Sequence, residues 1–135
     1  WLDAHDFEYI QEVGTMNIFF KINGKFITPN LSGSILSGIT RMSVIDLLRS
    51  KGFEVIERPI TISEIIEASQ NGTLEEAFGT GTAASVAPIG KLTFHTDVMQ
   101  LRPVEEWETM NWIKTTLDDI RYGRIQDNHG WILTV

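Results

Sequence analysis

Residues 34–41 read SILSGITR and lead directly into MSVIDLLR at residues 42–49. The second run carries apolar side chains at helical spacing, so it predicts a helix that begins near Thr40 and runs to about Ser50. The first run consists mainly of small residues and predicts a turn in front of that helix.

The junction has the features of an anion site. Gly38 has no Cβ and lets a ligand approach the main chain closely. The backbone N–H groups of Ile39, Thr40 and Arg41 are expected to lie unpaired at the positive end of the helix dipole. Such a site most naturally accepts a phosphate. The alternative is that Thr40 is only an N-cap and Gly38 only a turn residue.

The segment before the junction predicts an antiparallel sheet. Residues 16–22 are rich in β-formers, and Asn23-Gly24 predicts a type I′ turn into a strand at residues 25–28. Pro29 then ends that strand. Two shorter β-type runs precede them, at residues 1–4 and 8–13.

The remainder of the chain mixes strands and helices. Capping boxes are expected to open a helix over residues 65–70 and a short helical turn at residues 73–76. The other predicted elements are strands at 53–60, 85–89, 91–94 and 131–135 and a long helix at 104–122. Because strands and helices intermix without strict alternation, the sequence predicts an α/β fold, a mixed sheet with flanking helices, in a single domain spanning residues 1–135.

Composition narrows the function classes. The chain has 135 residues, a net charge of −7 and no cysteine. The acidic balance argues against a nucleic-acid surface, and the absence of cysteine excludes disulfides and thiolate metal sites. No run is long and apolar enough for a membrane span. We expect a cytoplasmic protein, and we expect the start at Trp1, without Met, to be a cut inside a longer protein.

Two further features could carry chemistry. The run GTGTAA at residues 79–84 offers N–H and hydroxyl donors for a second anion contact. Glu12 ends a β-run before Gly14, where its carboxylate could face a protonated ring nitrogen or a metal, or could simply be solvated. His5, His95 and His129 are isolated in polar turns, so no metal site is predicted.

Four motifs occur in a fixed order: EVGTMN at 12–17, LSGSILSGITR at 31–41, FGTGTAA at 78–84 and DIRYGR at 119–124. Their order and spacing closely resemble the C-terminal domain of branched-chain amino acid aminotransferases, which are fold-type IV pyridoxal-phosphate enzymes. The resemblance implies transamination of leucine, isoleucine and valine with 2-oxoglutarate and glutamate in a full-length parent, in branched-chain amino acid biosynthesis. The alternatives are a D-amino acid aminotransferase, an aminodeoxychorismate lyase-like enzyme, or a non-catalytic phosphate-ligand binding module.

The resemblance also implies roles for individual residues. Glu12 would face the pyridine nitrogen of pyridoxal 5′-phosphate, and Leu36 would pack on the ring. The amides of Ile39 and Thr40 and the hydroxyl of Thr82 would hold the phosphate, and Gly38 is a further implied cofactor contact. The implied substrate contacts come from Thr15, Ala83 and Ala84.

The resemblance places the family's Schiff-base lysine upstream of Trp1, so no catalytic residue is expected in this chain. The lysines at 21, 25, 51, 91 and 114 match none of the family's positions. We therefore expect this chain to be inactive alone and to require an N-terminal domain. The full-length protein is expected to form a homodimer or higher homo-oligomer.

Overall fold

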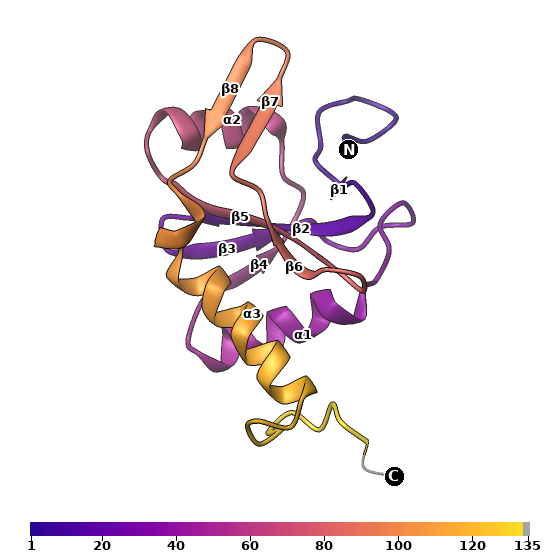
Figure 1. Ribbon diagram of the computed structural model, residues 1–135. Helices are drawn as coiled ribbons and strands as arrows, with labels where there is room; N and C mark the ends of the chain where they lie inside the picture. Colours follow the sequence, from indigo (N-terminus) through magenta and orange to yellow (C-terminus); the bar gives the residue numbers. More distant parts are fainter. Residues whose placement is uncertain (134–135) are drawn as a thin grey trace.

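The computed structural model describes residues 1–133 and has one mixed sheet at its centre (Figure 1). The strand order is β4-β3-β2-β5-β6, and β1 pairs with the free end of β2. The strands are β1 (Glu12–Val13), β2 (Met16–Ile22), β3 (Lys25–Thr28), β4 (Val55–Glu57), β5 (Leu74–Gly81) and β6 (Ser85–Pro88). All pairs are antiparallel except β3 with β4. The α/β prediction with a mixed sheet is therefore confirmed.

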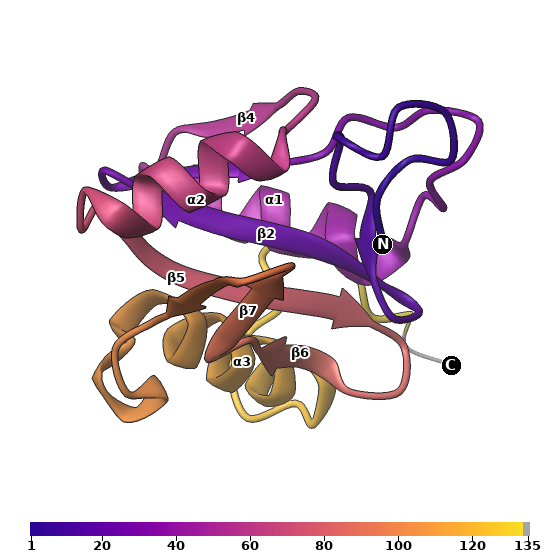
Figure 2. The ribbon, with the colours of Figure 1, turned by 90° about the horizontal axis from the view of Figure 1, so that it is seen from above.

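Helices and a separate hairpin cover the two faces of this sheet. Helices α1 (Ile39–Ser50) and α3 (Glu108–Arg121) lie on one face, and Figure 2 shows helix α2 (Ile62–Gln70) on the other. The hairpin of β7 (Lys91–Phe94) and β8 (Asp97–Gln100) lies on the same side as α2. A short 3₁₀ helix, η1 (Val104–Glu106), precedes α3. Among the described residues, no helix is both long and apolar enough to cross a membrane.

The central strand β2 contributes to the core on both faces of the sheet, because alternate side chains of a strand point to opposite faces. Phe19 lies on the face of α1 and α3, where its ring stacks on Phe78 of β5 with centroids 5.3 Å apart. Ile18 and Phe20 point to the opposite face, and both are almost fully buried. The β2–β3 turn has the predicted form, since Asn23 and Gly24 both have positive φ, at 50° and 73°.

Residues 73–76 do not form the predicted helical turn. They run into β5, the strand that pairs with β2 from Asn17 to Ile22. The Thr73 hydroxyl donates to the carbonyl of Ala68 at the end of α2, and it does not cap a new helix. The capping box at Thr61 makes the predicted contact, because Thr61 Oγ1 accepts from the Glu64 amide at 3.2 Å. The helix that it caps begins at Ile62, three residues before the predicted start at residue 65. Pairing with β2 therefore overrides the local signal at Thr73.

Other predicted boundaries also differ. The long helix is divided into η1 and α3, and β8 was not predicted. The first two β-type runs contribute only β1 and two isolated bridges, Leu2 with Ile10 and Tyr9 with Thr61. In the predicted last strand, residues 131–133 are not in a strand, and residues 134 and 135 lie outside the described part.

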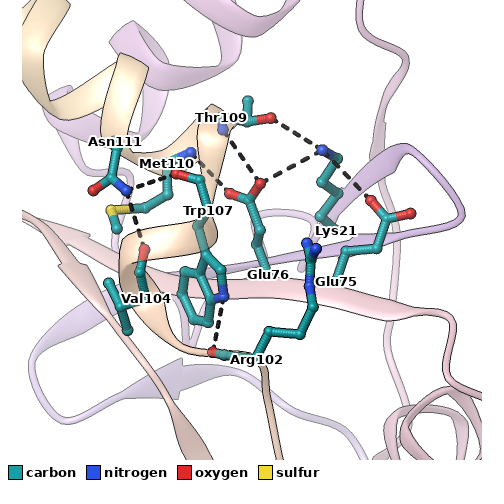
Figure 3. Close-up of polar contacts among 9 residues, drawn as sticks. All are labelled: Lys21, Glu75, Glu76, Arg102, Val104, Trp107, Thr109, Met110 and Asn111. Atoms are coloured by element: carbon teal, nitrogen blue, oxygen red, sulfur yellow. Dashed lines mark hydrogen bonds and ion pairs between the residues drawn. The ribbon is translucent and has the colours of Figure 1, made fainter.

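A buried carboxylate joins β5 to the start of α3 (Figure 3). Glu76 is 1% exposed and accepts hydrogen bonds from the amides of Thr109 at 3.3 Å and Met110 at 2.8 Å. Lys21 Nζ lies 3.5 Å from Glu76 Oε1 and 3.4 Å from Glu75 Oε2. The first amides of a helix have no main-chain partner within that helix. At the start of α3, the Glu76 side chain from the sheet takes the place of that partner.

A second buried polar contact ties α1 to the opposite edge of the sheet. Arg41 is 2% exposed, and its Nη2 donates to the Pro29 carbonyl at 3.1 Å and to Glu57 Oε1 at 2.8 Å. The hydrogen bond from Arg41 is the main reason that the pKa of Glu57 is lowered, and Arg49 adds to the effect. The start of α1 is therefore fixed against β3 and β4.

Substitution Glu76→Gln should lower the free energy of unfolding by about 2 kcal/mol, because an amide group would replace an acceptor that two buried N–H groups require. Glu75→Gln is the matched control, since Glu75 contacts the same lysine but caps no helix. Its effect should stay within about 0.5 kcal/mol. Urea denaturation of both variants measures the difference, and equal losses would contradict the assigned role of Glu76.

The Arg41–Glu57 pair should make stability depend on pH. The folded pKa of Glu57 is lowered from its ordinary value of 4.5, so this contribution is complete above that value and is lost as pH falls through the folded pKa. Glu57→Gln should therefore flatten the fall in unfolding free energy below about pH 4.5. Asp3 also has a lowered pKa, about 2, caused chiefly by the Asp6 amide, but it titrates in both proteins. Identical acid profiles of wild type and variant would exclude the effect.

Candidate functional site

The motifs singled out in the sequence meet at one end of the sheet. The β1–β2 turn, the β5–β6 turn and the start of α1 lie together there, although they are far apart in the chain. Within the sheet, Asn17 of β2 lies opposite Glu12 of β1 and opposite Thr80 of β5. The Thr40 hydroxyl lies 3.5 Å from the Gly81 carbonyl and joins α1 to the third motif.

The first turn of α1 presents main-chain donors. The helix begins at Ile39, its N-cap is Gly38, and no side chain of residues 1–133 caps it. The interpretation of Thr40 as an N-cap is therefore wrong, because Thr40 already lies inside the helix. The first turn carries no acidic residue, and the Ile39 side chain is 83% exposed. This end of α1 can accept an anion.

The turn in front of α1 is held from two sides through Leu36. Glu12 Oε1 accepts from the Leu36 amide at 3.2 Å, and Asn17 Nδ2 donates to the Leu36 carbonyl at 2.9 Å. The Leu36 side chain itself is 79% exposed. Glu12 is half-buried and has a defined contact, which a fully solvated strand-end carboxylate would not have.

A ligand was expected to approach the main chain closely at Gly38, but the group that does so in the structure is the side chain of Asn17. A Cβ on Gly38 would lie 2.4 Å from Asn17 Oδ1, a distance that side-chain carbons do not reach. Gly38 has φ −72°, so space and not backbone conformation requires glycine here. Asn17 was not among the candidate site residues, although its place in EVGTMN, at a buried strand position, was a usable signal.

The β5–β6 turn lies beside the start of α1. Thr82, Ala83 and Ala84 are exposed at its tip, and Thr15 is exposed in the neighbouring β1–β2 turn. Ser85 closes the turn with φ +54°, and its Oγ accepts from Arg121 Nη2 of α3 at 2.8 Å. Arg121 was also missed as a site residue, because helical spacing alone does not indicate which loop a helix end contacts.

The sequence is similar to those of known enzymes along its whole length. A family model described as amino-transferase class IV matches residues 2–92. Branched-chain-amino-acid aminotransferase 2 of Bacillus subtilis (strain 168) is 49% identical over 135 residues, which is 100% of this chain and 37% of that protein. This chain therefore spans well under half the length of that relative.

Solved structures agree with the family match. The branched-chain amino acid aminotransferase from Escherichia coli has a TM-score of 0.78 at 28% identity, over 96% of this chain and 40% of that one. An aminotransferase from Brucella abortus, solved bound to the co-factor PLP, has a TM-score of 0.68 at 28% identity, over 84% of this chain and 36% of that one. With a family match over most of its length and a shared fold, the chain belongs to the class IV amino-transferases.

Proposed function

We propose that this chain is the C-terminal, cofactor-binding domain of a longer branched-chain amino acid aminotransferase that uses pyridoxal 5′-phosphate (PLP). The observation that carries the proposal is the meeting of Glu12, Leu36 and the uncapped start of α1 at one end of the sheet. The similarity to a branched-chain aminotransferase over the whole chain supports the substrate class.

The described residues fit PLP. The cofactor has an anionic phosphate at one end and a basic ring nitrogen on the other side of its ring. The start of α1 offers only donors, and Thr82 adds an exposed hydroxyl nearby. Thr80 Oγ1, on the same sheet end, is buried without a hydrogen-bond partner among the described residues, so this region still has polar capacity.

The proposed contacts follow from this arrangement. The amides of Ile39 and Thr40, next to Gly38, hold the phosphate together with the Thr82 hydroxyl. Leu36 covers one face of the ring with its exposed side chain, and Glu12 keeps the ring nitrogen protonated. When bound, the cofactor accepts electrons from the substrate carbanion.

The substrate contacts lie in the two exposed turns. The amides of Ala83 and Ala84 receive the substrate's α-carboxylate, and Thr15 faces it from the β1–β2 turn. The substrates are leucine, isoleucine or valine on one side and 2-oxoglutarate on the other. The Schiff-base lysine comes from an N-terminal domain outside these 135 residues. We place the full-length homo-oligomer in the cytoplasm, in branched-chain amino acid biosynthesis.

The first test compares two proteins. The full-length protein should transaminate branched-chain amino acids with 2-oxoglutarate when PLP is added, and the isolated 135-residue chain should give no turnover because it lacks the lysine. Production of glutamate in a coupled assay measures both. Preference for D-amino acids, or release of pyruvate from aminodeoxychorismate, would instead identify a related enzyme. Phosphate-ester binding without any turnover of the full-length protein would indicate a binding module.

The second test concerns Glu12. In Glu12→Gln, the amide oxygen can still accept from Leu36, but the side chain can no longer keep the ring nitrogen protonated. The turnover number of the full-length protein should fall on the order of 10²-fold or more, with only a small change in PLP affinity. Glu8→Gln, a change at an exposed residue of the same segment, is the control. Full activity of Glu12→Gln would contradict the role proposed for this carboxylate.

A further inference from the structure

Asn17 connects the central strand to the turn in front of α1. It is only 6% exposed, although its side chain is polar. Its Nδ2 donates to the Leu36 carbonyl at 2.9 Å, and the Gly38 amide donates to that same carbonyl at 3.0 Å. The Gly38 carbonyl then accepts the first helical bond, from Met42, at 3.1 Å. A continuous set of hydrogen bonds therefore runs from β2 into the first turn of α1.

The other end of the same amide is also used. Asn17 Oδ1 lies against Gly38 so closely that no side-chain carbon could be added there. The Asn17 side-chain amide thus donates to the Leu36 carbonyl through its nitrogen and packs against Gly38 through its oxygen. Because β2 is the central strand, with β1 and β5 on either side of this residue, the anchor is rigid.

We propose that Asn17 is a positioning residue for the phosphate of the cofactor. It holds residues 36–38 against β2 and thereby directs the amides of Ile39 and Thr40 toward the phosphate. Asn17 itself does not touch the cofactor in this scheme. The inference rests on the function proposed above, and it assigns to Asn17 a role in phosphate recognition that is separate from overall stability.

The residue type agrees with this role. An aspartate would place a second oxygen against the Leu36 carbonyl, and a serine or alanine would be too short to reach it. Loss of the donor would release the Leu36 carbonyl and leave the turn free to shift. A main-chain N–H that is displaced from a charged acceptor loses most of its binding contribution.

The experiment measures dissociation constants of the full-length protein for PLP and for pyridoxal, which lacks the phosphate. In Asn17→Ala, the affinity for PLP should fall about tenfold or more, while the affinity for pyridoxal should change little. The ratio of the dissociation constant for pyridoxal to that for PLP should therefore fall. Asn111→Ala is the matched control, because Asn111 Nδ2 also donates to main-chain carbonyls, those of Val104 at 3.1 Å and Trp107 at 2.7 Å, far from this turn. It should leave the ratio unchanged.

A second variant keeps the test decisive if Asn17→Ala does not fold. Gly38→Ala places a Cβ against Asn17 Oδ1 and should also reduce the PLP-to-pyridoxal preference. The double variant Asn17→Ala/Gly38→Ala relieves that clash, so it should be no worse than Asn17→Ala alone. Additive losses would contradict the direct contact between the two residues.

The outcomes separate the two levels of the proposal. A wild-type protein that binds PLP no better than pyridoxal would overturn the proposed phosphate site itself. A wild-type preference for PLP that survives in both Asn17→Ala and Gly38→Ala would leave that site standing and overturn the role of Asn17.

Discussion

The antiparallel pairing of β2 with β5 fixes where two of the three segments of the candidate site lie. The pairing brings Asn17 opposite Thr80, so that the turn before β2 and the turn after β5 emerge at the same end of the sheet. The stacked rings of Phe19 and Phe78 secure this register from the helix side. A shift by one residue would turn each of these side chains to the opposite face and separate the motifs from α1.

The sequence predicted those features that depend only on interactions between neighbouring residues. Asn23-Gly24 forms the predicted turn because the conformation depends on those two residues, and Thr61 caps α2 because its partner is three residues away. Thr73 has the same local signal and forms no helix, since the residues after it pair with β2 and Glu76 accepts from the start of α3. A pattern within four residues cannot show that its acidic member is needed by a helix more than thirty residues later.

In the candidate site, too, sequence patterns indicated some residues, whereas contacts between distant parts of the chain were not predicted. The ordered motifs indicated Glu12, the start of α1 and the turn at Thr82, and the structure places these three features together. The residues that hold them in place were not predicted, because Asn17, Arg41 and Arg121 act through contacts with distant main-chain or hydroxyl groups. Sequence patterns thus indicated the groups that we propose to face a ligand, whereas the supporting contacts are visible only in three dimensions.

The hydrogen bond from the Leu36 amide to Glu12 links the two ends of the proposed cofactor site. The carboxylate that would face the ring nitrogen is hydrogen-bonded to the main chain only three residues before the first phosphate-binding amide. Movement of Glu12 toward a ligand would therefore pull on the turn that sets the direction of α1's first N–H groups. Recognition at the nitrogen and at the phosphate would then be energetically coupled, so the binding free energies of the two ends would not simply add.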